Sequence, residues 1–208
     1  RKLVDICKSL PDSSQIEFTV DSGKATVKAG RGRFTLSTLP ATEFPSVDES
    51  AGDQTLEIAQ SVVKRLIDRT AFAMAQQDVR YYLNGMLLEL KAGRLRMVAT
   101  DGHRLALCTA NEAVSTGDAA IIIPRKGVLE LSRLLDTDES IRLVIGSNHI
   151  RAANRQFTFT SKLVDGKFPE YERVLPKSAD KTVIGQRLEL RQAFTRTAIL
   201  SNEKYRGV

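Results

Sequence analysis

Residues 125–169 read RKGVLELSRLLDTDESIRLVIGSNHIRAANRQFTFTSKLVDGKFP, and the expected architecture follows from this stretch. Its first part places apolar residues at helical spacing, at Val128, Leu131, Leu134 and Leu135. Three short runs of alternating apolar and polar residues follow, with their apolar positions at Ile141, Leu143 and Ile145, then Ile150 and Ala152, then Phe157 and Phe159. Such alternation is typical of strands with one buried face, so the stretch predicts a helix followed by three antiparallel strands.

The same pattern occurs at the beginning of the chain. Arg1-Lys2 corresponds to Arg125-Lys126, and Phe44-Pro45 corresponds to Phe168-Pro169, at an offset of 123 or 124 residues over most of the segment. The helical positions are Leu3, Ile6, Cys7 and Leu10, and the strand positions are Ile16, Phe18 and Val20, then Ala25, Val27 and Ala29, then Phe34 and Leu36. This agreement indicates an internal duplication.

A second unit is also repeated. Arg69-Thr70-Ala71 lies in a predicted helix, and Arg196-Thr197-Ala198 lies in another. The apolar positions of these helices are Val63, Leu66, Ile67, Thr70 and Met74 in the first, and Leu190, Ala193, Phe194 and Thr197 in the second. The chain therefore alternates two units, one of a helix and three strands and one of a strand, a helix and three strands. We predict an α+β fold of repeated two-layer domains, each with helices on antiparallel sheet.

The repeats also predict the domain organisation. Residues 1–53 are expected to be the second half of one domain plus a linker, residues 54–180 a complete domain, and residues 181–208 the start of a third. The acidic, proline-containing stretch 43–53 and the stretch 171–181 are the expected linkers. The chain begins at Arg1 with neither an initiator Met nor the apolar region of a signal peptide.

Several local features add detail. Asp101-Gly102 predicts a two-residue hairpin turn, and Pro124 is expected in the first turn of the following helix. Cys7 and Cys108 are interpreted as reduced core residues, which favours a cytoplasmic protein. His103 and His149 have no Cys or His neighbours at metal-ligand spacing, so no zinc site is expected.

The charge pattern favours a polyanionic partner. The chain has 31 Lys and Arg against 25 Asp and Glu, a net charge of +6. The polar faces of the four predicted helices carry eleven basic residues and four acidic ones. The basic residues are Arg1, Lys2, Lys8, Lys64, Arg65, Arg69, Arg125, Lys126, Arg133, Arg191 and Arg196. Any single face of this kind is more often only solvated. Four helices that share the bias in repeated units predict one basic surface suited to a nucleic-acid backbone without base-specific recognition.

Motifs for enzymatic chemistry are weak. Gly23-Lys24 and Gly30-Arg31-Gly32-Arg33 lack the spacing of phosphate-binding and dinucleotide-binding loops. Asp101 and His103 could form a catalytic pair, but an exposed histidine in a hairpin turn is the simpler interpretation. We therefore predict no enzyme activity, no catalytic residue and no cofactor.

Three longer motifs resemble a known family. They are DVRYYLNG at residues 78–85, ATDGHRLA at residues 99–106, and FPxYxRVLP at residues 168–176. With Ile123-Pro124-Arg125-Lys126-Gly127 and residues 199–204, they are similar to the bacterial sliding clamp, the beta subunit of DNA polymerase III. The resemblance covers the chain in order. It implies a fragment with the end of the first clamp domain, all of the second and the start of the third.

The resemblance implies a role and its residues. Such a clamp is a homodimeric ring around duplex DNA that tethers the replicative polymerase and so confers processivity. The positions that match DNA-facing ones are Gln77, Arg80, Tyr81, Tyr82, Arg125 and Lys126. The positions that match an apolar cleft, where the polymerase alpha subunit, the clamp loader and repair proteins dock short linear peptides, are Arg80, Leu83, Thr100, Gly102, His103, Arg104, Leu105, Pro169, Arg173 and Val174. Phe34, Leu36, Ile199 and Leu200 match the dimer interface.

Two alternatives stay open. One is an autonomous α+β module that binds nucleic acid by its surface without encircling it, and the other is a hydrolase that uses His103. One departure is also present, because members of the clamp family are commonly acidic overall whereas this chain carries +6. Phe34 and Leu36 have an alternative as well, in which both belong wholly to the core of their own domain.

Overall fold

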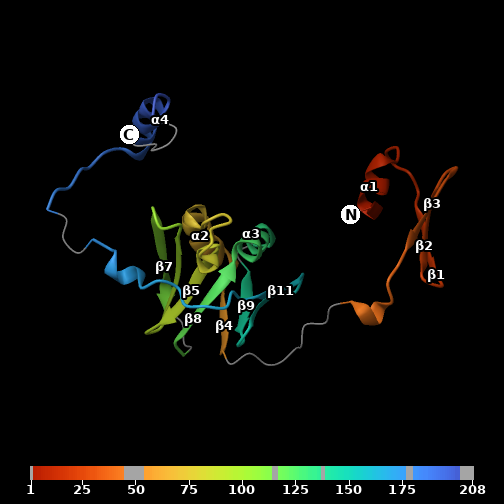
Figure 1. The fold of residues 1–208 in the computed structure, drawn as a ribbon, viewed down its shortest axis with the longest axis horizontal. Helices are drawn as coiled ribbons and strands as arrows, with labels where there is room; N and C mark the ends of the chain where they lie inside the picture. The colour runs from red at the N-terminus through yellow and green to blue at the C-terminus, as the bar shows by residue number, and fades with distance from the viewer. Residues whose placement is uncertain (1, 45–53, 114–116, 137–138, 177–179, 202–208) are drawn as a thin grey trace.

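The computed structural model describes residues 2–44, 54–113, 117–136, 139–176 and 180–201. Figure 1 shows a central body of sheets and helices, which is preceded along the chain by a smaller helix-and-sheet unit and followed by one helix. The class is α+β with antiparallel sheets, as the repeats predict. Within the described residues, no helix combines the length and apolar character that a bilayer-spanning helix requires.

The N-terminal unit contains one helix and one sheet. Helix α1 (Lys2–Ser9) is followed by β1 (Glu17–Asp21), β2 (Lys24–Ala29) and β3 (Gly32–Ser37), which form an antiparallel sheet in the order β1-β2-β3. A short 3-10 helix, η1 (Ala41–Glu43), follows. These elements agree with the predicted helix and three strands, but among residues 2–44 only Ala25 and Val27 are buried.

The central body is built from two similar halves. The first half contains β4 (Gln54–Ala59), α2 (Gln60–Thr70), β5 (Gly85–Lys91), β6 (Arg94–Thr100) and β7 (Leu105–Ala113). The second contains β8 (Ala119–Pro124), α3 (Arg125–Leu134), β9 (Ser140–Ile145), β10 (His149–Ala153) and β11 (Thr158–Lys162). Each half therefore has a strand, a helix and then three strands.

The two halves exchange their first strands. The sheets have the orders β7-β6-β5-β8 and β11-β10-β9-β4, so β8 completes the first sheet and β4 completes the second. The register pairs Leu56 of β4 with Leu143 of β9, and Leu87 of β5 with Ile122 of β8. Neither sheet is complete without a strand from the other half.

The main core lies between the sheets and the helices. Leu88 and Met97 from one sheet, Ile141 and Leu143 from the other, and Leu66 of α2 all belong to the same buried cluster. Helices α2 and α3 lie together on one side of the sheets (Figure 1). Gly127 lets α3 approach β11, because a Cβ at this position would lie 2.6 Å from the Ser161 Oγ atom.

After β11 the chain crosses the opposite face of the first sheet. We call residues 164–176 the connector. It contains the 3-10 helix η4 (Tyr171–Arg173), and further along the chain helix α4 (Arg187–Ala198) follows. A second, smaller buried cluster joins Phe168 and Tyr171 of the connector to Leu87, Val98 and Ile122 of the sheet.

The structure corrects five local predictions. Asp101-Gly102 is not a two-residue turn, because Thr100 pairs with Leu105 and four residues connect the strands. Pro124 is the N-cap residue of α3 and not part of its first turn. Leu134 is exposed and Leu135 buried, since the helix ends between them. Cys7 is exposed. Strand β11 begins after Phe157.

One strand was not predicted. Residues 119–124 form β8, although their run of apolar residues has no polar alternation. Pro45, Arg1, residues 46–53 and residues 202–204, which contribute to the predicted linker and motifs, lie outside the described residues.

Candidate functional sites

Helices α2 and α3 form the first candidate site, a basic surface. The two helices are bridged by Lys64, whose Nζ donates to the Ser132 carbonyl oxygen at 3.1 Å and lies 3.8 Å from the Asp68 carboxylate. Arg133 is paired with Glu130 at 2.9 Å. Among the described residues, Arg69 and Lys126 have no ion pair within 4 Å, so their charges remain available to a ligand.

Arg125 and Lys126 begin α3 and point to different surroundings. The Arg125 guanidinium is half-buried, and its Nη1 donates to the Met74 carbonyl oxygen at 3.3 Å. Lys126 is exposed. The sequence pattern predicts the two residues to be an equivalent pair, but in this structure Arg125 also fastens the preceding loop to the helix.

That loop, residues 74–84, carries five predicted site residues beside the start of α3: Gln77, Arg80, Tyr81, Tyr82 and Leu83. The Ala75 N–H donates to the Leu83 carbonyl at 3.0 Å, and the Arg125 N–H donates to the Asn84 carbonyl at 2.9 Å. Asn84 closes the loop through two bonds to the Asp78 backbone, at 2.9 and 2.8 Å. Gln77 is exposed and has a φ of 55°, in the left-handed region that few non-glycine residues adopt.

The two tyrosines of the loop differ in exposure. Their rings meet edge to face with centroids 5.8 Å apart. Tyr81 is exposed, whereas Tyr82 packs against the smaller buried cluster. Only Tyr81 therefore offers most of its ring to a ligand in this structure. Leu83 is 2% exposed and supports the loop from beneath, so its side chain does not line the surface.

Arg80 joins this loop to the second candidate site. Its Nε and Nη2 donate to the two carboxylate oxygens of Asp78 at 3.0 and 2.8 Å, and Nη2 also lies 3.3 Å from the Asp101 carbonyl oxygen. The hydrogen bond from Arg80 lowers the pKa of Asp78 from 3.8 to about 2. The same pair raises the pKa of Arg80. Arg80 thus faces the 101–104 loop with its charge already paired.

The loop of residues 101–104 is held by its own hydrogen bonds. Thr100 Oγ1 donates to the Arg104 carbonyl at 2.7 Å and accepts from the Gly102 N–H at 3.1 Å. Asp101 Oδ1 accepts from the N–H groups of His103 and Arg104, both at 3.0 Å. Gly102 has a φ of 89°, and a Cβ there would lie 3.0 Å from the Arg80 guanidinium.

These bonds bear on the proposed Asp–His pair. Burial alone would raise the pKa of Asp101, but the backbone bonds and the Arg104 guanidinium, whose Nε donates at 3.0 Å, bring that pKa below its ordinary value. Asp101 accepts from the main chain of His103, and its two oxygens are occupied by the loop and by Arg104. The geometry therefore supports the structural interpretation of this turn over a catalytic one.

The predicted cleft residues fall into two neighbouring segments. His103 and Arg104 are exposed on the 101–104 loop, where the Arg104 guanidinium lies 5.6 Å from the centre of the Phe72 ring. Leu105 packs against the cluster that contains Phe168 and Tyr171. On the connector, the exposed members of the set are Pro169, Arg173 and Val174. The cluster beneath Leu105 thus brings the two segments together.

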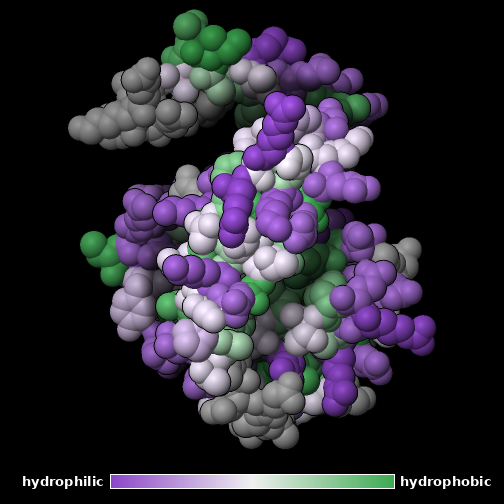
Figure 2. All heavy atoms as spheres, turned by 90° about the vertical axis from the view of Figure 1, so that its right-hand side faces the viewer, coloured by the Kyte–Doolittle hydropathy of each residue, from purple (hydrophilic) through white to green (hydrophobic). Residues whose placement is uncertain are grey.

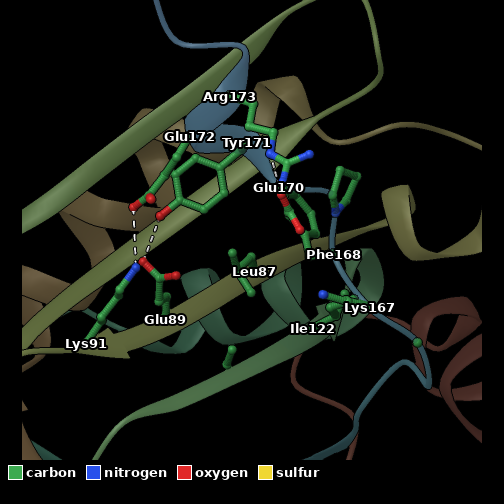
Figure 3. Close-up of a pocket in the computed structure, with 13 residues that line it drawn as sticks. Leu87, Glu89, Lys91, Ile122, Lys167, Phe168, Glu170, Tyr171, Glu172 and Arg173 are labelled. Atoms are coloured by element: carbon green, nitrogen blue, oxygen red, sulfur yellow. Dashed lines mark hydrogen bonds and ion pairs between the residues drawn. The ribbon is translucent and has the colours of Figure 1, made fainter.

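A pocket of about 440 Å³ opens between the connector and the sheet. Figure 3 shows its lining, with Leu87 and Ile122 on the sheet side and Phe168 and Tyr171 on the connector side. Pro169 and Arg173 are its only residues in common with the predicted cleft. Glu89, Arg96 and Tyr171 were not identified from the sequence, although charged residues at inward positions of otherwise apolar strands indicate that a buried partner exists.

The predicted interface residues lie at the two ends of the chain. Phe34 and Leu36 of β3 pair with the buried Val27 and Ala25, so they share the inner face of the N-terminal sheet and are half-buried. Ile199 and Leu200 are 76% and 93% exposed. Figure 2 shows hydrophobic side chains, in green, at the top of the view where α4 lies, in agreement with the exposed Leu190 and Phe194 of that helix.

No metal centre is placed by the described part of the chain, which contains no group of three or more His, Cys, Asp or Glu side chains arranged around an ion. Both described cysteines are free thiols. The candidate sites are therefore two. The first is the basic surface on helices α2 and α3 with the loop beside it, and the second is the surface formed by residues 101–105 and the connector.

Comparison with known proteins gives the same family for two parts of the chain. Residues 57–170 match the family described as DNA polymerase III beta subunit, central domain. Residues 1–48 match the N-terminal domain of the same subunit. The beta sliding clamps of Pseudomonas aeruginosa and Escherichia coli K12 are 63% and 53% identical to the chain over its whole length. The chain spans 57% of the length of these curated relatives.

Solved structures agree. The crystal structure of the DNA polymerase III subunit beta from Pseudomonas aeruginosa has a TM-score of 0.88 at 62% identity, over 99% of this chain and 57% of that one. A sliding clamp from Bartonella birtlesii, bound to griselimycin, has a TM-score of 0.86 at 36% identity, with the same shares covered.

Proposed function

Because the chain belongs to the DNA polymerase III beta subunit family, we propose that its full-length parent is a sliding clamp that encircles duplex DNA and tethers the replicative polymerase. The observation that carries this proposal is the pair of helices α2 and α3, which lie side by side on one face of a family-matched domain and expose Arg69, Lys126 and Arg133. No reaction, metal or cofactor is part of the proposal.

The basic surface suits a clamp because a sliding protein needs weak contacts that are independent of sequence. Electrostatic contact with phosphates has this property, and base-specific bonds would hold the protein at one site. We assign the DNA-facing side to Lys126, Gln77 and Tyr81, with Tyr82 and Arg125 behind them. Arg80 is the weakest member, because Asp78 already neutralises its charge at 2.8 Å.

The proposed domains are the end of a first clamp domain at residues 1–53, a complete second domain at 54–180 and the start of a third at 181–208. The family matches at 1–48 and 57–170 support the first two. The central body also supports them, because the exchange of β4 and β8 closes both of its sheets within residues 54–162.

The proposed second site binds short linear peptides from the polymerase alpha subunit, the clamp loader and repair proteins. Leu105, Pro169 and Val174 provide apolar surface, and His103, Arg104 and Arg173 provide polar groups around it, a combination suited to a peptide with apolar anchors. Thr100 and Gly102 shape the loop of residues 101–104, and the buried Leu83 supports the neighbouring loop that carries Arg80. As a DNA-replication protein, the parent is proposed to act in the cytoplasm.

The proposed ring is a homodimer. Phe34 and Leu36 of one subunit would meet Ile199 and Leu200 of the other, next to paired edge strands. Ile199 and Leu200 are 76% and 93% exposed, so both side chains are accessible to a partner in this structure. Ile199→Ala with Leu200→Ala should shift the full-length dimer towards monomer in sedimentation. The 208-residue chain alone should form at best a weak dimer.

Retention on DNA tests the ring. The full-length parent should stay on nicked circular DNA through a high-salt wash, and linearising the DNA should release it because a ring slides off a free end. A surface-binding module would be lost from both forms equally, and that result would overturn the proposal. The 208-residue chain should not be retained on the circle.

Calorimetry tests the second site. Leu105→Lys in the full-length parent should weaken binding of a synthetic polymerase-tail peptide by at least about 2 kcal/mol, because an unpaired charge would be buried against the peptide. Equal affinity in the variant and the wild type would remove Leu105 from the site.

A further inference from the structure

The connector carries half of the proposed peptide site on very little structure of its own. Pro169, Arg173 and Val174 are all exposed, and η4 has only three residues. Its local backbone bonds are those from Tyr171 N–H to the Pro169 carbonyl at 2.7 Å, and from Arg173 and Val174 to Glu170 and Tyr171, both at 3.1 Å. A single short turn has little independent stability, so contacts with the sheet must hold it.

Phe168 and Tyr171 provide those contacts. Both are buried, and they pack on Leu87, Val98 and Ile122, one residue from each of strands β5, β6 and β8. Figure 3 shows both aromatic side chains directed from the connector toward the sheet. The Val164 N–H also donates to the Ile122 carbonyl at 2.8 Å where the connector begins. Apolar packing is not directional, however, so by itself it does not fix the position of a short segment on the sheet.

Three polar groups remove that freedom. The Tyr171 hydroxyl donates to Glu89 Oε2 at 2.7 Å and accepts from Arg96 Nη1 at 2.8 Å. Glu89 and Arg96 are register partners on β5 and β6, and their carboxylate and guanidinium lie 3.4 Å apart. Their side chains are only 14% and 23% exposed. Hydrogen bonds to charged groups with little solvent contact are short, directional and stronger than neutral ones.

The protonation state of the hydroxyl is suited to this role. Burial is the largest influence on Tyr171 and raises the pKa of its phenol, and the adjacent Glu89 carboxylate raises it further. The hydroxyl therefore keeps its proton at neutral pH and donates it to Glu89. A second contact, between Glu172 and the cations of Arg96 and Lys91 at 3.3 and 3.6 Å, is more than half exposed at Glu172 and contributes little.

We propose that Glu89, Arg96 and Tyr171 are positioning residues that anchor the connector to the sheet and thereby set the geometry of the peptide site. We call these three residues the anchor. Its two sheet residues, Glu89 and Arg96, hold the hydroxyl of Tyr171, which lies in the connector between Pro169 and Val174. Leu105 on the facing segment packs on the same buried cluster. The anchor thus sets the distance between the two segments that a peptide would touch. This inference rests on the proposed peptide docking.

The test is Tyr171→Phe in the full-length parent, because it keeps the buried ring and removes only the hydroxyl. Hydrogen exchange should become faster at residues 170–174 while the rest of the central body stays protected. Affinity for a synthetic peptide that copies the C-terminal tail of a DNA polymerase III alpha subunit should fall about tenfold, as loss of a charge-assisted hydrogen bond predicts. Retention on nicked circular DNA should not change.

Glu172→Gln is the matched control. It lies in the same 3-10 helix and next to the anchor, but its charge pair is exposed, so exchange and peptide affinity should stay within twofold of wild type. A second pair of variants tests the acceptor. Glu89→Gln keeps an oxygen for the Tyr171 hydroxyl and should retain most of the affinity, whereas Glu89→Leu should behave like Tyr171→Phe.

The two measurements separate the possible failures. Unchanged exchange at residues 170–174 in Tyr171→Phe would overturn the anchor, whatever the peptide does. Faster exchange with unchanged peptide affinity would overturn its link to the peptide site. Absence of peptide binding by the wild type would overturn the proposed docking and the link together, and the exchange data would still decide the anchor.

Discussion

The N-terminal unit and the second half of the central body share one sequence pattern and differ in what they bury. Strand β9 places Ile141, Leu143 and Ile145 in the core, each at most 5% exposed. Strand β1 has the corresponding apolar residues Phe18 and Val20, which are 50% and 60% exposed. Helix α3 buries Gly127, Val128 and Leu131, whereas α1 buries no residue.

The difference follows from the neighbours of each unit. Strand β9 lies inside its sheet because β4 pairs with its second edge, and α3 contacts α2 and strand β5 of the other half. Strand β1 is at the edge of a three-stranded sheet in the described part of the chain. An amphipathic pattern thus states which face can be buried, and a second unit is needed to bury it.

The largest effect should come from removing the extra strand. Ile58→Pro in β4 takes away a buried side chain and a donor to the β9 ladder, so unfolding should become easier by more than about 3 kcal/mol. Strand β9 should then exchange its amide hydrogens as readily as β1. Chemical denaturation and hydrogen exchange of the chain check this, and continued protection of β9 would show that β4 is not what distinguishes the two units.

A smaller effect should come from matched core truncations. Leu143→Ala, at a position 1% exposed, should lower the free energy of unfolding by about 2–5 kcal/mol. Val20→Ala in β1 should change it by less than about 0.5 kcal/mol, because the side chain is mostly in water already. Denaturation midpoints of both variants give the comparison. Equal losses would mean that the N-terminal unit buries β1 in solution.

The basic residues at the helix starts allow a functional comparison. Lys2 and Lys126 are repeat partners, and both are exposed. In the full-length parent, Lys126→Ala or Lys2→Ala should each flatten the logarithmic salt dependence of DNA binding by about one unit, as loss of one phosphate contact predicts. Arg125→Ala should change the slope less, because its guanidinium is bonded to Met74.

Lys91→Ala provides the control for that measurement. Lys91 is an exposed lysine beside the connector, where it pairs with Glu172, on the sheet face away from the helices. Its removal should leave the salt slope at the wild-type value. If the Lys126 and Lys91 variants have the same slope, α3 does not contact the DNA backbone.

The smallest effect concerns the ion pairs of the two regions. Asp78 and Arg80 hold the loop beside α3, whereas Lys28 and Glu17 pair on the exposed N-terminal sheet, with side chains 45% and 59% exposed. Since the pKa of Asp78 falls from 3.8 to about 2 on folding, its charged form stabilises the fold above pH 4. That contribution is lost as the pH falls from 4 to 2.

An NMR titration of the Asp78 carboxyl checks this pH dependence. The midpoint should be near 2, and the advantage in stability over Asp78→Asn should shrink between pH 4 and 2. A midpoint near the ordinary 3.8 would show that Arg80 does not hold the carboxylate in solution.

Most of the elements could be predicted because their periodicity is local. Apolar residues every second position predicted β1, β2, β9 and β10, and three- and four-residue spacing predicted α2 and α3. Strand β8 was missed because both of its faces are covered, so its apolar run shows no alternation. The four-residue loop at Asp101 was missed because side-chain bonds from Thr100 and Asp101, which composition does not show, hold it.

The candidate sites divide in the same way. The basic character of the helices is a matter of composition, so the sequence alone indicates it. Which cations remain free could not be predicted in this way, because the Arg125 side chain bonds Met74, 51 positions earlier in the sequence, and Arg80 is paired with Asp78 inside the loop. The anchor could not be predicted either, because Tyr171 bonds Arg96 and Glu89, which lie 75 and 82 positions earlier in the sequence.

Residue order over short stretches was enough to predict the repeated units, the amphipathic faces, the basic helices and the family that the chain resembles. The folded protein was needed to show that β4 and β8 are exchanged between the two halves, that α3 is buried where α1 is not, and that the connector is held on the sheet. Those outcomes depend on the free energy of contacts between distant segments. Such contacts produce no periodic spacing of apolar residues that could be recognised in the sequence.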